Sequence, residues 1–396
     1  MSAAAIEPLG EFPAPLLLPE DDLALDPRHP TQSLRSWIQA EYRNKVTPER
    51  KTLYLAVPPG YETDVDFAKK WAQPRPKSKL SGIEQPKAQD ILEYLQAFYH
   101  GLPVKLFPQE ELRFTSEFGD IDMPETDEKR QTIGLHFKES YMSKGIRTRP
   151  KPKGDYSHQL NLSDLLIATM WALPEDAYAL VMLVEHDLYE DEEDEFVCGR
   201  AYGGSRVAVI TTARYNPVLD GKQSVEREHA WPASHCTAYL DTMLEDGEQA
   251  TRKRKRSAAD NEVDGAKGDT AIQAAVSAHH ALPSLEKSTS AALLSGLWLG
   301  RVCRTASHEL GHCFGIGHCV YYACSMQGSA SITEDARQPP YLCPVDLAKI
   351  LHATGADVTE RYQALLQYCE KHKDVHLFAA YGAWIRSRLR KLEIGV

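Results

Sequence analysis

The segment HELGHCFGIGHC, at residues 308–319, restricts the fold more than any other part of this chain. It places three histidines, one glutamate and two cysteines, all side chains that bind metal ions, within twelve positions. Positions four apart on an α-helix lie one turn above each other, so His308 and His312 face the same side and can bind one ion. Glu309 lies about 100° around the helix, where it can contact a water molecule on that ion without being a ligand.

Gly315 provides the sharp turn that a third ligand requires, because glycine adopts the left-handed conformation that ends helices. After this turn, His318 can return to the ion and complete a three-histidine site with an open fourth position. Zinc sites with an open position are typical of catalysis, whereas structural zinc sites are closed. The alternative is a buried helix with structural histidines, which would leave polar groups unpaired at a high cost in free energy. We therefore predict a catalytic zinc ion bound by His308, His312 and His318.

Such a site predicts the hydrolysis of peptide bonds. Zinc lowers the pKa of a bound water molecule and polarises the carbonyl oxygen of a peptide bond. Glu309 is then expected to act as the general base, taking the proton from water and passing it to the leaving amine. A rival interpretation is a non-catalytic zinc-binding protein, in which the metal only holds segments of the chain together. The presence of Glu309 argues against it, because a purely structural site has no need of a base.

A second group of candidate ligands follows at once: Cys319, Cys324 and, after a loop, Cys343. Structural zinc sites use four thiolate or imidazole ligands arranged as a tetrahedron. Asp346 stands where a Cys-x-x-Cys pair would supply the fourth thiolate. A carboxylate can bind zinc, although oxygen is a harder donor than sulfur in a soft shell. The sequence thus favours a second, structural zinc with Asp346 as its least secure ligand; the alternative is three cysteines packed without metal.

The other five cysteines are weaker candidates. Cys303 and Cys313 lie on the predicted motif helix, and Cys313 should point away from its zinc-binding side. Cys198, Cys236 and Cys369 are isolated in the sequence, and each is expected to be a small buried apolar residue.

Composition excludes several classes of protein. The net charge of −11 argues against a protein that mainly coats nucleic acid or anionic lipid, so we expect no direct nucleic-acid binding. The longest apolar run, residues 177–184, is too short to cross a membrane. The first residues lack the basic flank of a secretory signal. We therefore expect an intracellular protein, cytoplasmic or nuclear, that is not secreted; the oligomeric state stays open.

The hydrophobic periodicity predicts alternating helices and strands, which is typical of an α/β architecture. Helices are expected at residues 31–42, 87–99 and 162–173, around the motif, and at 358–369 and 377–385. Strands are expected at residues 52–57, 111–114, 132–137, 177–189 and 206–212, and a loop at 147–157.

We divide the chain into an N-terminal lead-in and accessory segment (1–85), a catalytic domain (86–350) and a C-terminal helical segment (351–396). The catalytic domain carries an insertion at 221–285, whose part from about 247 to 270 is expected to be disordered because it has almost no large apolar residues.

Two charged runs allow a functional and a simpler interpretation. KRKR, within the insertion, resembles a nuclear-import or acidic-partner patch, which would make the chain a nuclear interaction protein. The acidic run 185–195 could line the cleft and favour basic peptides. For both runs, the sequence favours a solvated surface segment.

Three motifs resemble those of the archaemetzincin family. HELGHCFGIGHC, ACSM and LCPVD follow the pattern His-Glu-x-x-His-x-x-Gly-x-x-His-Cys-x4-Cys-x-Met, which ends in that family with Cys-x-x-Cys. HDLYEDEEDEFVCGRAYGGSRVAVITTARY is similar to the strand–loop–strand that precedes the active-site helix, and GLPVKLFP and QTIGLHFK also resemble family segments. The likeness covers roughly residues 90–350 without the basic insertion.

The resemblance implies a metzincin-like zinc-peptidase fold of the α/β class. In that fold, a mixed twisted sheet lies over an active-site helix, and a smaller lower subdomain follows the glycine turn. Met326 matches the methionine turn beneath the metal, and Asp346 departs from the fourth ligand of the structural zinc. The resemblance also implies a zinc metallopeptidase that acts on peptide or protein substrates, with aminopeptidase-like action on short ones. It assigns the catalytic zinc to His308, His312 and His318, the base to Glu309, and the structural zinc to Cys319, Cys324 and Cys343.

Overall fold

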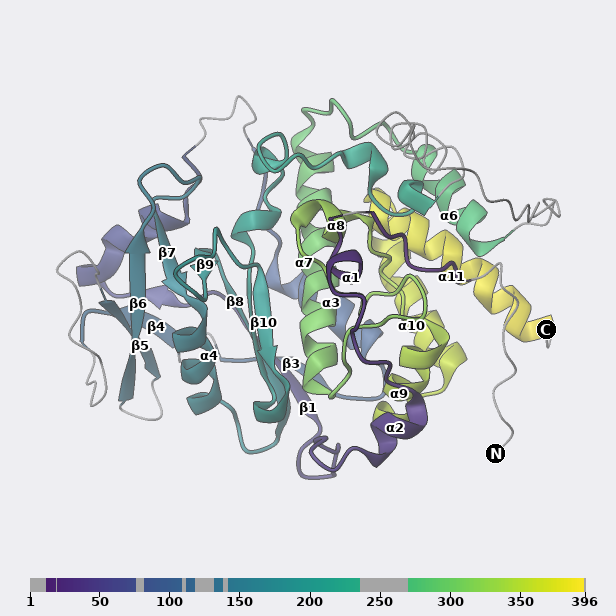
Figure 1. The fold of residues 1–396 in the computed structure, drawn as a ribbon, viewed down its shortest axis with the longest axis horizontal. Coiled ribbons are helices and arrows are strands. Elements are labelled where there is room, and N and C mark those ends of the chain that lie inside the picture. Colours follow the sequence, from purple (N-terminus) through teal and green to yellow (C-terminus); the bar gives the residue numbers. More distant parts are fainter. Residues whose placement is uncertain are drawn as a thin grey trace.

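The structure, a computed structural model, describes residues 12–18, 20–75, 82–108, 112–117, 132–137, 142–235 and 270–394. These parts form a mixed α/β fold with two β-sheets on one side and most of the helices on the other (Figure 1). The α/β class predicted from the sequence is therefore confirmed. Cys236, the KRKR run and the expected disordered region up to residue 269 lie outside the described residues.

A five-stranded sheet forms the centre of the molecule. Its strand order is β10-β11-β8-β1-β3, with β10 antiparallel to β11 and the other neighbours parallel. The strands are β1 (Thr52–Ala56), β3 (Val104–Leu106), β8 (Ala177–Val184), β10 (Gly199–Tyr202) and β11 (Val207–Thr211).

The central strand β8 is buried along its whole length because both faces of this sheet are covered. Successive side chains of a strand point to opposite faces. Val181 and Leu183 accordingly join the core beneath the helices, whereas Leu180 and Met182 join a second core on the other side.

The second core lies between the five-stranded sheet and a six-stranded sheet of order β2-β4-β5-β6-β7-β9. Its strands are β2 (Gly60–Tyr61), β4 (Leu112–Thr115), β5 (Thr132–Phe137), β6 (Met142–Pro150), β7 (His158–Asn161) and β9 (Asp187–Tyr189). Helix α4 (Leu162–Trp171) fills this core with Leu162, Leu165 and Leu166.

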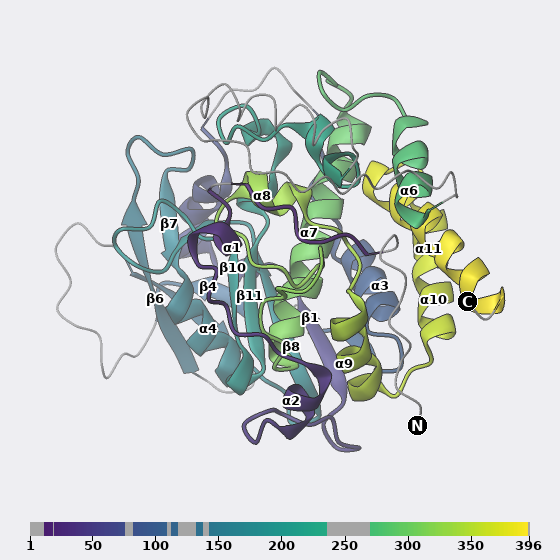
Figure 2. The same cartoon turned by 45° about the vertical axis from the view of Figure 1, so that its right-hand side comes forward.

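The longest helix, α7 (Ala291–Cys313), packs against strands β8, β10 and β11 and is covered by α3 and α11 (Figure 2). The other helices are α1 (Asp22–Leu25), α2 (Leu34–Gln39), α3 (Ala88–Phe98), α6 (Ala271–His280), α8 (Ile332–Arg337), α9 (Pro344–Thr354), α10 (Val358–Lys371) and α11 (His376–Ile394). Short 3-10 helices lie at Thr63–Ala72, Gly203–Ser205, Ala213–Tyr215, Pro217–Leu219, Arg227–His229 and Ala233–His235.

Among the described residues, no helix combines the length and the apolar character that crossing a bilayer requires. One hydrophobic core includes residues on both sides of residue 350, among them Ile350 itself and Trp384. The domain boundaries proposed above stay predictions.

Two details of the predicted elements are wrong. The apolar run 177–189 forms two strands in different sheets, β8 and β9, because the chain leaves the central sheet at His186. There the Thr211 hydroxyl donates to the His186 carbonyl at 2.5 Å, and the His186 ring lies 3.1 Å from the Ala68 carbonyl. The loop expected at 147–157 begins as strand β6, because Thr148, Arg149 and Pro150 pair antiparallel with Leu160, Gln159 and His158 of β7.

Candidate metal centres

Helix α7 carries His308, Glu309 and His312 in its last two turns. It begins at Ser290, whose side-chain oxygen accepts the N–H of Leu293 at 3.4 Å and caps the helix. It ends at Cys313, and Gly315, two residues later, has a φ of +72° in the left-handed region that favours glycine. The chain therefore reverses directly after His312 and brings the following residues back along the helix.

This reversal places His318 beside the two helical histidines, and we call the three the histidine centre. The Nε2 atoms of His308 and His312 are 3.0 Å apart. The His318 ring centre lies 5.5 Å from that of His308 and 5.0 Å from that of His312. One nitrogen of each ring lies within 4.8 Å of the others. Two nitrogens on one tetrahedral zinc are about 3.3 Å apart, so this arrangement fits the donor set of a zinc ion.

The opposite ring nitrogens of the two helical histidines are held by backbone carbonyls. Nδ1 of His308 lies 2.7 Å from the Ser325 carbonyl, and Nδ1 of His312 lies 2.7 Å from the Ile316 carbonyl. A carbonyl only accepts, so both Nδ1 atoms carry the hydrogen, and in neutral rings both Nε2 atoms are then acceptors. Two lone pairs consequently face each other at 3.0 Å, an arrangement that a cation between them would relieve.

Burial keeps these rings neutral. It lowers the pKa of His308 well below its usual value, and the positive charges that His312 and His318 can carry lower it further. Burial likewise lowers the pKa of His312 and of His318 to about 4. All three are therefore neutral at pH 7, which is the form of histidine that binds metal ions.

Glu309 lies on the same turn and is only 8% exposed. It lines, with the histidine centre, a cavity of about 690 Å³ whose walls include strand β10 and the loop 329–332. Burial raises the pKa of Glu309 to about 8; Arg200 opposes this shift and Asp335 adds to it. The cavity thus combines neutral imidazoles with one carboxyl that readily takes up a proton.

Met326 packs directly beneath this turn of α7. It is fully buried, and a Cβ atom on Gly311 would lie 2.4 Å from its sulfur, so any larger residue at position 311 would displace the Met326 side chain. Met326 also accepts the N–H of Cys319 through its carbonyl at 2.8 Å, which connects the floor beneath the helix to the chain after His318.

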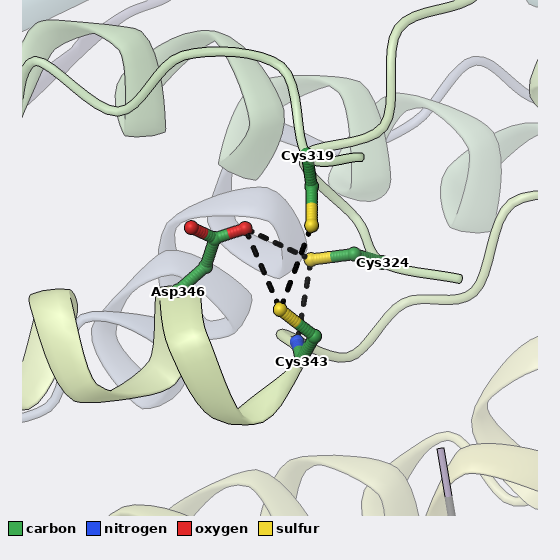
Figure 3. A group of neighbouring side chains, drawn as sticks. All are labelled: Cys319, Cys324, Cys343 and Asp346. Carbon is green, nitrogen blue, oxygen red and sulfur yellow. Dashed lines mark hydrogen bonds between the residues drawn. The ribbon is translucent and has the colours of Figure 1, made fainter. Parts of the chain in front are cut away.

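The four residues of the second predicted site, Cys319, Cys324, Cys343 and Asp346, also meet, and we call them the cysteine centre. Their side chains point toward one another, Asp346 from the first turn of α9 (Figure 3). The Cys319 and Cys343 sulfurs are 3.6 Å apart, and an Asp346 oxygen lies 3.4 Å from the Cys324 sulfur. No member is more than 3% exposed.

The charge of Asp346 is paired with Lys349, whose ammonium group also donates to Oε1 of Gln32 at 3.0 Å. Lys349, itself 1% exposed, donates to the Asp346 oxygen that faces away from the sulfurs, at 2.7 Å. Burial and the neighbouring Cys319 raise the pKa of Asp346 to about 6, and Lys349 opposes this shift. Cys303 and Cys313, the alternative ligands considered from the sequence, lie outside this group of four.

The acidic run 185–195 contributes Glu190 to the cavity wall. The Glu190 carboxylate is bonded to the guanidinium of Arg200, so its charge is already paired. This pairing favours the structural interpretation of the run over selection of basic peptides.

Sequence reasoning missed three residues between positions 22 and 32. Asp22 and His29 lie beside His318, and Gln32 bonds to both sides of the glycine turn. Nothing in the local sequence marks them, because their partners follow more than 280 positions later. The apolar positions of the predicted helix 31–42 were the one available sign that this segment packs onto the domain.

Comparison with known proteins supports the resemblance predicted from the motifs. The family model described as Peptidase family M54 matches residues 274–351, a stretch that contains both centres. Archaemetzincin-2 of Macaca fascicularis is 29% identical over 212 residues, which cover 54% of this chain and 47% of that protein. The chain thus spans about half the length of the curated relatives it matches. The resemblance to the archaemetzincins is confirmed.

Two solved structures are more distant. A crystal structure of archaemetzincin from Methanopyrus kandleri has 18% identity and a TM-score of 0.35, and covers 78% of this chain and 99% of its own. A zinc-dependent peptidase from Methanocorpusculum labreanum has 15% identity and a TM-score of 0.33, and covers 75% of this chain and 99% of its own. At these values, neither structure contributes to the assignment of residues.

Proposed function

Because the chain resembles the archaemetzincins, we propose that it is a zinc-dependent metallopeptidase of this type. His308, His312 and His318 are the proposed ligands of the catalytic zinc, and Glu309 is the proposed general base. The observation that carries the proposal is the pair of Nε2 atoms that face each other at 3.0 Å while both Nδ1 atoms bond to carbonyls. Neutral rings in this arrangement need a cation.

The bound ion supplies Lewis acidity toward a peptide carbonyl and its attacking water. The chain supplies the proton transfers and the geometry. The Glu309 carboxylate accepts the proton of the attacking water and then delivers it to the leaving amine. Burial raises the pKa of this carboxyl to about 8 in the metal-free protein. A bound cation would lower this pKa again and leave Glu309 as the carboxylate that a general base requires.

Strand β10 offers a binding edge for an extended peptide. It is the last strand in the order of its sheet and pairs with β11 on one side. Gly199, Arg200 and Ala201 of this strand line the cavity that contains Glu309. A substrate backbone can pair with such an edge through its own N–H and C=O groups. We propose peptide substrates, with aminopeptidase-like action on short ones.

We propose a second, structural zinc at the cysteine centre, bound by Cys319, Cys324, Cys343 and Asp346. Three sulfurs and one carboxylate oxygen that converge in a fully buried space match a closed tetrahedral site. The metzincin-like arrangement of a smaller subdomain after the Gly315 turn is part of this proposal.

The variant Glu309→Gln tests the catalytic role, because it keeps the size of the side chain and removes its ability to accept a proton. We expect zinc content to stay the same and peptide hydrolysis to fall by about 10²- to 10⁴-fold. Glu360→Gln, an exposed position on α10, is the matched control and should keep full activity.

The same experiment separates the rival function. A wild-type protein that binds zinc but cleaves no peptide in a broad library would support the zinc-binding interaction module. Hydrolysis that survives Glu309→Gln would remove the proposed base.

A further inference from the structure

The N-terminal segment, which we define as residues 20–44, packs against the end of α7. In both overall views it crosses α7 between α8 and α9 (Figures 1 and 2). Asp21 forms a buried ion pair with Arg337 at 2.5 Å. Farther along, Trp37, 1% exposed, donates its indole N–H to the Phe314 carbonyl at 2.9 Å. Both ends of the segment are therefore held in place by buried contacts.

Between these anchors, the segment presents Asp22 to the histidine centre. An Asp22 oxygen lies 3.9 Å from Nδ1 of His318 and 3.0 Å from Nε2 of His29. The backbone N–H of Asp22 donates to Glu334 at 3.0 Å, which fixes the position of the residue. The carboxylate is thus placed between two imidazoles.

Gly328 shows that this contact depends on close packing. A Cβ atom at Gly328 would lie 2.2 Å from the Asp22 carboxylate and 2.7 Å from Nδ1 of His318. Any other residue would occupy the space where the carboxylate and the imidazole approach each other. The loop from Met326 to Gly328 thus leaves room for this pair.

The three histidines differ in what faces their outer nitrogen. His308 and His312 have backbone carbonyls at 2.7 Å, whereas Nδ1 of His318 faces the Asp22 carboxylate. Hydrogen-bonded partners fix the tautomer and the ring direction of a metal-binding histidine and raise its basicity. The Asp22 carboxylate lies at an ion-pair distance instead, so it acts on the His318 ring through its charge. His318 is also the ligand that lies outside α7, so its direction is not set by the helix.

We propose that Asp22 is the positioning residue of His318, and that the N-terminal segment thereby completes the zinc site. His29 holds the Asp22 carboxylate from the opposite side. Gln32 assists by bracketing the turn: it donates to the Gly315 carbonyl at 2.9 Å and accepts the Gly317 N–H at 3.1 Å. This inference rests on the proposed catalytic zinc.

The test is the zinc affinity of the full chain, measured by competition with a chromogenic chelator at pH 7. Asp22→Asn keeps the shape of the side chain and its backbone contact but removes the charge. Of the two proposed zinc ions, we take the one at the histidine centre to be the more weakly bound. We expect its dissociation constant to rise by about 10- to 100-fold. Asp26→Asn is the control: it lies four residues away, its side chain contacts only the exposed N–H of Arg28, and zinc binding should not change.

A second measurement distinguishes the positioning of His318 from a general contribution of Asp22 to the stability of the fold. The zinc-free Asp22→Asn protein should unfold at the same urea concentration as the zinc-free wild type, since the proposed role appears only with the metal. Gly328→Ala should weaken zinc binding at least as much as Asp22→Asn does, because the added methyl group would displace both the Asp22 carboxylate and the His318 ring.

Three results would overturn the inference. Unchanged zinc affinity in Asp22→Asn would remove the positioning role. The role would also be removed if Asp22→Asn lowered the stability of the zinc-free protein as much as that of the zinc-loaded protein. Loss of a whole metal equivalent with unchanged affinity of the remainder would assign Asp22, His29 and His318 to a separate cation. A wild-type protein that binds no zinc through His308 would instead refute the proposed function itself.

Discussion

The histidine centre and the cysteine centre are adjacent in the chain, since His318 is followed directly by Cys319, yet they face different surroundings. The three histidines are half-buried and line a cavity of about 690 Å³, whereas no member of the cysteine centre is more than 3% exposed. One chain reversal at Gly315 thus separates a site that substrate can reach from a site that solvent cannot. This difference in burial is the one that separates open from closed zinc sites, and it agrees with the proposal of a catalytic ion in the first and a structural ion in the second.

The largest expected effect tests this division of roles. Cys343→Ser should remove one zinc equivalent and lower the free energy of unfolding by on the order of 4 kcal/mol, because it breaks a buried metal site. His308→Gln should remove the other equivalent and abolish hydrolysis while lowering that free energy by about 1 kcal/mol. Urea unfolding and elemental analysis measure both effects.

Cys369→Ser is the control for that comparison. Its thiol is buried, 2% exposed, and lies outside both centres, so both metal equivalents should remain. Equal destabilisation by Cys343→Ser and His308→Gln would show that the two centres do not divide structure from catalysis.

The next effect concerns the charge balance of the cysteine centre. Lys349→Met leaves Asp346 without its buried partner, which should cost about 3 kcal/mol of unfolding free energy in the zinc-free protein. A bound zinc ion compensates the same carboxylate, so the cost should be clearly smaller in the zinc-loaded protein. Lys51→Met, at an exposed position, should change neither state. The same cost with and without zinc would exclude Asp346 as a ligand.

The last effect is a pH dependence that differs in sign between the centres. Burial lowers the pKa of His312 and His318 from 6.5 to about 4, so the unfolded zinc-free chain takes up protons before the folded one. The stability present above pH 6.5 should therefore fall toward pH 4, by up to about 1.4 kcal/mol per pH unit for each histidine. Asp346, whose pKa is raised from 3.8 to about 6, contributes stability that is lost as pH rises through this range.

Urea unfolding of the zinc-free protein between pH 5 and 7 measures this dependence. Other buried histidines, such as His186, contribute equally to wild type and variants, so the difference is informative. The double variant His312→Gln/His318→Gln should show a shallower slope; an unchanged slope would contradict the pKa assignment.

The parts of the site that sequence alone predicted are those with local causes. The spacing of His308 and His312 and the turn at Gly315 follow from helix geometry and from glycine's freedom at positive φ. Strand β5 was likewise predicted at residues 132–137, where the structure has it.

The rest depends on distant partners. The run 177–189 is apolar throughout, and nothing within it shows that its two halves belong to different sheets. Strand β6 extends into the expected loop because its last residues pair with β7, on the far side of that loop. Asp22 and Gln32 were missed for the same reason. Their partners are His318 for Asp22 and Gly315 and Gly317 for Gln32, which follow more than 280 positions later.

That separation has a consequence during synthesis. Gln32 leaves the ribosome 283 residues before Gly315. At typical elongation rates, this interval lasts roughly 15 to 60 seconds. During this interval, the Trp37 indole lacks its acceptor, the Phe314 carbonyl, which has not yet been synthesised. A nascent chain therefore forms these contacts around the proposed zinc site only after Gly315 has left the ribosome, so the N-terminal segment cannot support the site before then.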